Sequence, residues 1–242
     1  MKIISVNGSP HKDKGNTYII VKAFLDGARQ ADAEIVEIFL QDKKIDYCLG
    51  CYMCWAKIPG KCVQKDDMQE IISEVLKSDV LLLSTPVYID GVSSQTKTFL
   101  DRLIPVLRAH FRLLNGHCRH KIGVERMPGL FLISSSGFIE MDNFDPMIES
   151  VKRGCLNLYM DYKGHLIRPG SHLLRLKDVY GHEIEVVIKA AREAGKEFVK
   201  YGRVSDETAA KVALPFCKKE EFIKQTNRLW DIFIENVRQK RR

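Results

Sequence analysis

Four cysteines lie close together near the middle of the first half of the chain. Cys48, Cys51, Cys54 and Cys62 fall within fifteen residues, separated by two, two and seven residues. Thiolate is the soft ligand that holds iron-sulfur clusters and structural zinc. This spacing is short enough for one inorganic centre and favours redox chemistry. The alternative is a set of reduced core thiols, because cysteine also behaves as a small buried hydrophobe.

A second candidate site is the polar loop 8–17, which follows an apolar β-branched run and precedes a segment with helical spacing. Its hydroxyls, its amide side chain and its backbone donors open onto a helix N-terminus, where unpaired N–H groups and the helix dipole favour an anion. The loop lacks both Gly-Lys-Ser/Thr and Gly-x-Gly-x-x-Gly, so a phosphate monoester fits better than a triphosphate. A purely structural turn is the alternative.

Two further loops follow buried apolar runs. In the loop 85–91, Pro86 and Tyr88 offer a flat apolar wall; the loop 134–138 supplies hydroxyls, a glycine for close approach and Phe138. Each of these loops, taken singly, is also consistent with a plain strand-ending turn. Together with the loop 8–17, they describe a pocket for a phosphate at one end and a planar ring at the other, which is the shape of flavin mononucleotide (FMN).

The hydrophobic pattern predicts the elements that must position these loops. Strands are expected at 2–7, 34–40, 79–84, 130–134 and 164–168, and helices at 18–28, 67–77, 93–107, 144–159 and 183–201. Alternating strands and helices imply an α/β fold with a doubly wound, mostly parallel five-stranded sheet. In such a sheet the ligand lies beyond the carboxyl ends of the strands, where all three loops would meet.

The C-terminal part of the chain predicts a helical extension. We expect a domain at 1–203 and an extension at 204–242, with helices at 206–214 and 219–237 separated by Pro215. Phe222, Leu229, Phe233 and Val237 form an apolar stripe along the second helix. Such a stripe must be covered, either by the domain itself or by a partner subunit, and we expect a homo-oligomer.

Composition places the chain among ordinary globular proteins. It has 242 residues, of which 45% are apolar and 29% charged, and a formal net charge of +7. Basic residues gather at 108–121 and at 218–242, but without the interleaved aromatics of a base-stacking surface, so we expect no nucleic acid partner. No apolar run approaches the roughly 18 residues of a membrane span, and we expect a cytoplasmic protein. Cys118, Cys155 and Cys217 are expected to be ordinary buried residues.

These motifs, in linked order over residues 1–137, resemble the flavodoxin-like NAD(P)H-dependent FMN reductases, and more narrowly their iron-sulfur flavoprotein branch. The residues that carry the resemblance are Gly8-Ser9-Pro10 with Gly15-Asn16-Thr17, the cysteine quartet, Asp66-Asp67-Met68, Thr85-Pro86-Val87-Tyr88 and Lys97 to Arg102. The match after residue 138 is much looser.

The resemblance implies a flavodoxin-like fold with bound FMN. It places Ser9, Asn16 and Thr17 toward the phosphate, with His11 standing where relatives have arginine, and a histidine can also donate to phosphate. The residues implied around the ring are Pro86, Val87, Tyr88, Ser135, Gly137 and Phe138. Tyr88 at the ring edge is the candidate catalytic residue. In the iron-sulfur branch a quartet such as Cys48, Cys51, Cys54 and Cys62 holds a 4Fe-4S cluster, whereas zinc and uncoordinated thiols stay open for this chain.

The resulting functional hypothesis is an FMN-dependent oxidoreductase that takes hydride from NAD(P)H and passes electrons to a small acceptor or to the cluster. A second hypothesis is an electron-transfer flavoprotein that receives electrons from a ferredoxin-like protein, which the basic patches would steer. A third, non-enzymatic hypothesis is a zinc-stabilised or ligand-sensing binding module, since this architecture hosts many functions.

Overall fold

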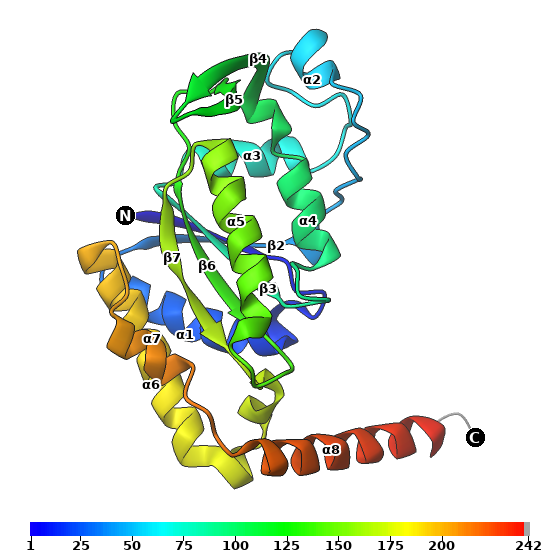
Figure 1. Ribbon diagram of the computed structural model, residues 1–242, viewed down its shortest axis with the longest axis vertical. Coiled ribbons are helices and arrows are strands. Elements are labelled where there is room, and N and C mark those ends of the chain that lie inside the picture. Colours follow the sequence, from blue (N-terminus) through cyan, green and yellow to red (C-terminus); the bar gives the residue numbers. More distant parts are fainter. Residues whose placement is uncertain (240–242) are drawn as a thin grey trace.

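The computed structural model describes residues 1–239, and a five-stranded parallel sheet forms its centre (Figure 1). The strands stand in the order β2-β1-β3-β6-β7. They are β1 (Lys2–Asn7), β2 (Glu34–Phe39), β3 (Val80–Pro86), β6 (Gly129–Ser135) and β7 (Tyr162–Arg168). The chain passes from β1 to β2 at one edge and then crosses back over β1 to β3, so the strand order reverses beside β1, as expected for a doubly wound α/β topology.

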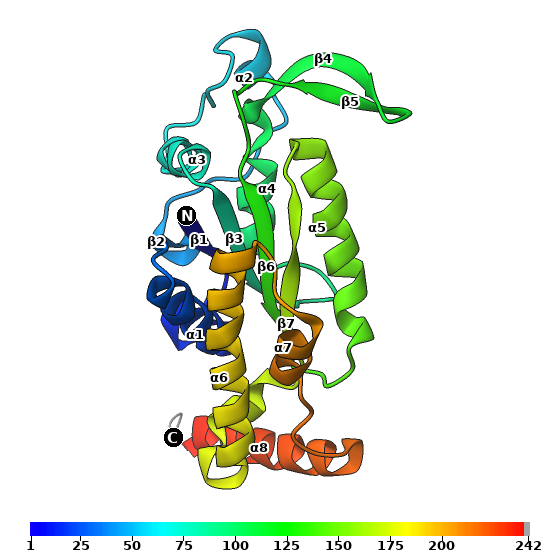
Figure 2. The same ribbon diagram turned by 90° about the vertical axis from the view of Figure 1, so that its left-hand side faces the viewer.

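Helices cover both faces of the sheet (Figure 2). One face carries α1 (Asn16–Gln30) and α6 (Lys177–Tyr201); the other carries α3 (Met68–Leu76), α4 (Ser94–Asp101) and α5 (Asp145–Leu158). Side chains of β1, β3 and β6 alternate between the two apolar cores on either face, and nearly all of them are buried. This double coverage explains why these strands read as uninterrupted apolar runs.

The closest helix pair is α1 against α6, and two glycines permit it. A Cβ at Gly27 would lie 1.8 Å from the Arg192 carbonyl oxygen, and one at Gly195 would lie 1.9 Å from that of Phe24. Backbone atoms of the two helices therefore occupy the space that any larger side chain would need.

One expected helix is shorter than its predicted range. The helix predicted at 93–107 ends at Asp101, because Pro105 cannot continue it; a 3-10 turn (Ile104–Val106) follows instead. The chain then forms an antiparallel hairpin of β4 (Leu107–Leu114) and β5 (His117–Ile122), a segment that stands out in the sequence only as a basic patch. Asn115 and Gly116 both have positive φ at its turn, and an Asn-Gly pair was the available signal.

The C-terminal region is helical as expected, with α7 (Asp206–Val212) and α8 (Lys219–Gln239). The buried Arg168 at the end of β7 donates to the carbonyl oxygens of Val212 (3.1 Å) and Leu214 (2.6 Å), which ties the end of α7 to the sheet. Beyond its first turns, α8 extends away from the sheet (Figures 1 and 2). Residues 240–242 of the predicted extension lie outside the described residues.

Among residues 1–239, no helix combines the length and the apolar character that crossing a membrane requires.

Candidate functional site

The polar loop 8–17 lies at the carboxyl end of β1, as the pattern predicted. The Ser9 N–H donates to Asn7 Oδ1 (2.8 Å), and the His11 N–H donates to Ser9 Oγ (3.2 Å), so the loop is built from its own side chains. Ser9 is buried, whereas His11 is exposed. This geometry turns the chain sharply from the strand into α1.

Gly8 lets this loop approach the N-terminus of α4. A Cβ at Gly8 would lie 1.7 Å from Thr96 Oγ1, and the hydroxyl of Ser93 donates to the Gly8 carbonyl oxygen at 2.5 Å. The position therefore requires glycine because of space rather than backbone conformation.

The first turn of α1 presents backbone donors at the end of this loop. Gly15 precedes the helix, and within the described chain no side chain caps its first N–H groups. The buried Asn7 Nδ2 likewise meets no hydrogen-bond acceptor among residues 1–239. Unpaired donors at a helix N-terminus are what an anion such as phosphate binds.

Ser135 joins the three predicted loops. Its hydroxyl lies 2.7 Å from Thr17 Oγ1 in a buried contact, and its carbonyl oxygen accepts from the Val87 N–H at 2.9 Å. Next to it, Ser134 Oγ donates to the Thr85 carbonyl oxygen at 2.6 Å. The carboxyl ends of β1, β3 and β6 are thus held against one another by hydrogen bonds.

The loop after β3 ends in a tight turn at the rim of this region. Tyr88 and Gly91 exchange backbone hydrogen bonds, and the two residues between them, Ile89 and Asp90, both have positive φ. Pro86 and Val87 are half-buried, and Tyr88 is 47% exposed. The loop therefore presents an apolar surface whose outer edge is a tyrosine ring.

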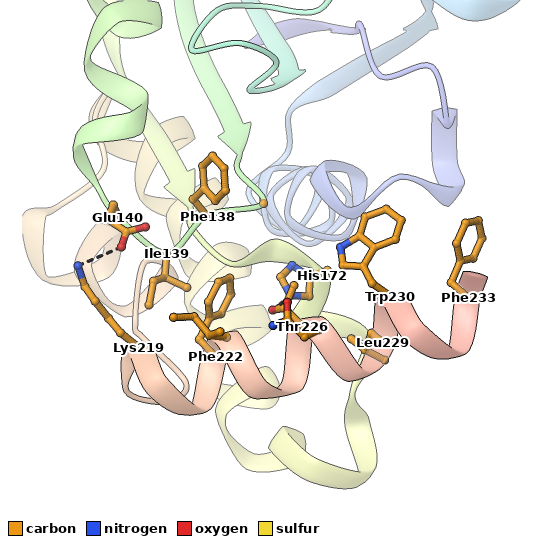
Figure 3. A pocket seen from close by; sticks show the side chains of 13 residues that line it. Phe138, Ile139, Glu140, His172, Lys219, Phe222, Thr226, Leu229, Trp230 and Phe233 are labelled. Atoms are coloured by element: carbon orange, nitrogen blue, oxygen red, sulfur yellow. Dashed lines mark hydrogen bonds and ion pairs between the residues drawn. The ribbon is translucent and has the colours of Figure 1, made fainter. Parts of the chain in front are cut away.

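The loop after β6 lies between the strand ends and α8 (Figure 3). Gly137 and Phe138 line a cavity of about 780 Å³ together with residues of α8, and Phe138 is 65% exposed. Glu140 pairs with Lys219 at 3.0 Å, and the His172 ring lies 2.9 Å from Thr226 Oγ1, which attaches the start of α8 to this edge. Of the predicted ring residues, Gly137 and Phe138 thus share a cavity with the C-terminal helix, whereas Pro86, Val87, Tyr88 and Ser135 do not line it.

The four clustered cysteines line a single small hollow, although they differ in exposure. Cys48 and Cys51 are exposed, Cys62 is half-buried and Cys54, in the short helix α2 (Met53–Ala56), is buried. Burial and the neighbouring Cys62 raise the pKa of the Cys54 thiol. Within residues 1–239, no three His, Cys, Asp or Glu side chains are arranged to hold a metal ion. The four thiols share a hollow without forming a finished coordination site.

Arg102 lies in the wall of the same hollow. It pairs with Asp66 through two short contacts (Nη1–Oδ2 2.6 Å and Nη2–Oδ1 2.9 Å), and both side chains are 1% exposed. Burial opposes the charge of Arg102, but the hydrogen bond to Asp66 and the nearby Cys62 raise the pKa of the guanidinium. A fixed positive charge beside thiols favours thiolate, which is the form that binds metals.

The chain is similar to known proteins in both sequence and fold. The model of the family described as NADPH-dependent FMN reductase matches residues 1–125, which is more than half of the chain. The chain belongs to this family. The loops 8–17 and 85–91 and the four clustered cysteines lie within the matched region, whereas the loop 134–138 lies beyond it.

Curated proteins that are similar to this chain are named iron-sulfur flavoproteins. One from Archaeoglobus fulgidus is 42% identical over 105 residues, covering 43% of this chain and 46% of the relative. Another, from Methanocaldococcus jannaschii, is 41% identical over 115 residues, covering 48% and 58%. The chain spans about half the length of the curated relatives it matches.

Solved structures agree on the fold. An FMN-dependent NADH-azoreductase from Bacillus anthracis in complex with FMN aligns over 82% of this chain and 99% of its own, with a TM-score of 0.58 and 17% identity. An NAD(P)H:quinone oxidoreductase from Methanothermobacter marburgensis aligns over 82% and 96%, with a TM-score of 0.58 and 18% identity. Both confirm the flavodoxin-like α/β architecture of this FMN reductase family member.

The structure also adds three residues to the candidate sites. Asn7, Arg102 and Arg175 were not assigned roles from the sequence. Arg175 Nε donates to Asn16 Oδ1 at 2.6 Å, and its Nη2 donates to the Lys14 carbonyl oxygen. No local pattern could reveal this contact, since Arg175 is 159 residues away from Asn16. The side-chain oxygen Oδ1 of Asn16 therefore accepts from Arg175. The side-chain nitrogen Nδ2 is the group left to donate to a phosphate.

The three remaining cysteines were expected to be buried, and only one is. Cys155 is buried, but Cys118 is exposed on the hairpin and Cys217 is half-buried. Cys118 lies opposite the exposed Leu113 near the tip of the two-stranded hairpin, where neither side chain is buried by other residues of 1–239.

Proposed function

We propose that this chain is an oxidoreductase that binds FMN, takes hydride from NAD(P)H and passes the electrons to a small acceptor. The observation that carries the proposal is the junction at Ser135, which contacts Thr17 and Val87 and so unites an anion-binding helix start with an apolar wall. An anion-binding end and an apolar end match the phosphate and the planar ring of FMN in polarity.

Each part of the site has a defined task in this proposal. Bound FMN would supply the hydride and electron chemistry. Its phosphate would be held by the Nδ2 groups of Asn7 and Asn16, the side chains of Ser9 and Thr17, and the first N–H groups of α1, with His11 at the exposed edge. Pro86 and Val87 would hold the ring, with Tyr88 at its edge as the candidate catalytic residue that orients the nicotinamide. Ser135, Gly137 and Phe138 would line the opposite side.

We further propose that Cys48, Cys51, Cys54 and Cys62 hold a 4Fe-4S cluster, which would receive electrons from the flavin. The donor set suits this group, and the name of the A. fulgidus relative supports it. Arg102 would stabilise the negative charge that the cluster and its thiolates bring.

One preparation tests both proposals. The chain is purified without oxygen, its visible spectrum is recorded, and FMN, iron, acid-labile sulfide and zinc are measured per chain. We expect FMN absorbance that NADH or NADPH bleaches, together with iron and sulfide in about fourfold amounts. Protein that contains active FMN but no iron would support the proposed flavin enzyme and contradict the proposed cluster. Colourless protein that contains zinc would overturn both in favour of a zinc-stabilised binding module.

A second candidate is an electron-transfer flavoprotein supplied by a ferredoxin-like protein. The specific observation in its favour is the basic hairpin that lies beside the cysteine hollow. Reduction of the flavin by a reduced ferredoxin, but not by NADH or NADPH, would replace the first proposal with this one.

We also propose that the chain consists of a domain at 1–203 and a helical extension at 204–242. In the proposed homo-oligomer a second copy of the chain covers α8. Large apolar side chains of α8 are exposed, among them Trp230 at 58% and Phe233 at 57%. An isolated helix with an uncovered apolar face is unstable in water, so a second copy would stabilise it. Sedimentation at the mass of one chain would contradict this assembly.

A further inference from the structure

The β4–β5 hairpin carries a charge that the chain itself does not neutralise. Between residues 107 and 122 there are four Lys or Arg and three His but no Asp or Glu. These basic residues are Arg108, His110, Arg112, His117, Arg119, His120 and Lys121. Within residues 1–239 no carboxylate pairs with any of them. A single-sign field of this kind attracts acidic partners over distances comparable to the Debye length.

The hairpin is also held in place rather than hanging free. The Arg112 guanidinium lies 5.2 Å from the centre of the Tyr159 ring, and the hydroxyl of Tyr159 donates to the His120 carbonyl oxygen at 2.6 Å. Figure 2 shows the ribbon anchored near the end of α5 and projecting past it. A preorganised surface of this kind loses little conformational entropy when a partner binds.

One face of the ribbon is apolar and exposed. Phe111 pairs with His120 across the strands and Leu113 pairs with Cys118, so these four side chains share a face. Phe111 is 63% exposed and Leu113 is 74% exposed. Arg112 and Arg119 pair on the other face of the ribbon, so charge flanks the apolar side chains, as in protein interfaces with an apolar centre and a polar rim.

This face continues as a row of rings toward the cysteine hollow. The centre of the His120 ring lies 4.3 Å from that of Phe111 and 4.6 Å from that of Trp55, and Trp55 lies 5.2 Å from Tyr52. Tyr52 itself lines the hollow, next to Cys51. A protein seated on the row would therefore lie next to the four thiols.

We propose that the β4–β5 hairpin is the docking surface for a redox protein with an acidic face. The basic residues would steer this partner toward the hairpin, and its contact would be made on the row from Phe111 to Tyr52. The inference rests on the proposed function in that it takes the cysteine hollow as a redox site. Each electron that this chain gives up is gained by the partner's centre, or the reverse. A nucleic acid fits the charge but not the position beside the hollow.

Charge and contact can be separated by measuring rates. The probe is an acidic plant-type ferredoxin, and surface plasmon resonance with the full chain gives its association and dissociation rates at about 20 mM and about 500 mM salt. The double variant Arg119→Glu/Lys121→Glu, which keeps the contact of Arg112 with Tyr159, should lower the association rate at low salt by about tenfold, since steering acts on association. The variant Phe111→Ser should instead raise the dissociation rate by about tenfold, since it removes contact area.

The matched control reverses two charges at the other end of the molecule, on α8 (Figure 1). Lys224→Glu/Arg228→Glu changes the net charge by the same amount and should alter the association rate by less than about threefold. Equal loss in both double variants, or an unchanged dissociation rate for Phe111→Ser, would overturn the docking surface. So would tighter binding of a single-stranded DNA oligonucleotide that fails in the same variants.

Failure of the proposed function gives a different result. FMN content and bleaching by NADH or NADPH are measured on the same preparation, and the resonance signal does not depend on a flavin. Suppose that the protein reduces its flavin normally but binds ferredoxin equally well with and without the hairpin charges. This result would support the proposed enzyme and contradict the proposed docking surface.

Discussion

Arg102 and Asp66 form a two-contact ion pair in the wall of the cysteine hollow, with Nη1–Oδ2 and Nη2–Oδ1 distances of 2.6 and 2.9 Å. Arg102 also donates to the Asp46 carbonyl oxygen at 2.6 Å, so one guanidinium joins α4, the start of α3 and the segment that leads to Cys48. The pair fixes where the cysteine loop leaves the domain.

Replacing Asp66 should destabilise the fold strongly. Asp66→Asn leaves the buried Arg102 without its counter-charge, which costs about 3–5 kcal/mol of unfolding free energy. Asp101→Asn is the control, because Asp101 pairs with Lys97 at the surface and such pairs contribute at most about 1 kcal/mol. Urea unfolding at neutral pH measures both. A loss for Asp66→Asn as small as that of the control would contradict the role of the pair.

The same pair predicts a dependence on pH. Burial opposes the charge of Asp66, but hydrogen bonds from Arg102 and from the backbone lower the pKa of its carboxyl below the ordinary value of 3.8. The stabilisation is therefore complete above that ordinary value and is lost as the pH falls through the lowered one. Unfolding free energies of the natural chain and of Asp66→Asn should converge in acid. If the two unfolding free energies differ by a constant amount down to the pH of acid unfolding, the predicted pH dependence is wrong.

Gly27 and Gly195 should not tolerate alanine. A Cβ at either position meets backbone of the facing helix below 2 Å, so Gly27→Ala or Gly195→Ala should cost about 1–3 kcal/mol by overpacking. Gly154→Ala in α5 is the matched control: nothing lies within 4 Å of its Cβ, and helix propensity should stabilise it by up to about 1 kcal/mol. Thermal unfolding midpoints should therefore move in opposite directions.

The contact between Thr17 and Ser135 should influence FMN affinity. Ser135→Ala removes the 2.7 Å contact and one link between the phosphate loop and the ring loops, which should weaken FMN binding by about 2–12-fold. Fluorescence titration of flavin-free protein with FMN gives the affinity. Ser94→Ala, at the exposed start of α4, is the control and should bind FMN like the natural chain. Equal affinities for both variants would show that the junction does not organise the site.

Arg168 should hold α7 on the sheet. Arg168→Met keeps the length of the side chain but removes the hydrogen bonds to Val212 and Leu214 and the contact with the Phe216 ring at 4.0 Å. Hydrogen bonds to charged groups contribute about 1.5–3 kcal/mol, so α7 should loosen locally. Limited proteolysis should then cut between residues 203 and 219 faster than in the natural chain, whereas Arg228→Met on α8 should not change cleavage there.

Cysteine reactivity should follow exposure and pKa. In metal-free native protein at about pH 8, Cys48, Cys51 and Cys118 should be alkylated first, because they are exposed. Burial raises the pKa of Cys155 to about 12, so this thiol should react only after unfolding. Mass spectrometry of iodoacetamide-treated protein identifies the modified positions. Early modification of Cys155 would mean that α5 opens in the native state.

Much of this protein is determined locally by its sequence. The apolar runs at 2–7, 79–84 and 130–134 become strands because only a sheet covered on both faces buries every side chain of such a run. The loops that follow them meet because parallel strands end at one edge. The family resemblance of the cysteines and loops is likewise contained in short motifs, and the match over residues 1–125 confirms it.

Other features were decided only by the tertiary structure, because they depend on residues far apart in the chain. Ser135 meets Thr17 across 118 residues, and Arg175 meets Asn16 across 159 residues. The row from Phe111 to Tyr52 exists because a hairpin folds back over the cysteine loop. Pattern and propensity describe neighbours along the chain, whereas these contacts follow from how a twisted sheet and its covering helices close in space.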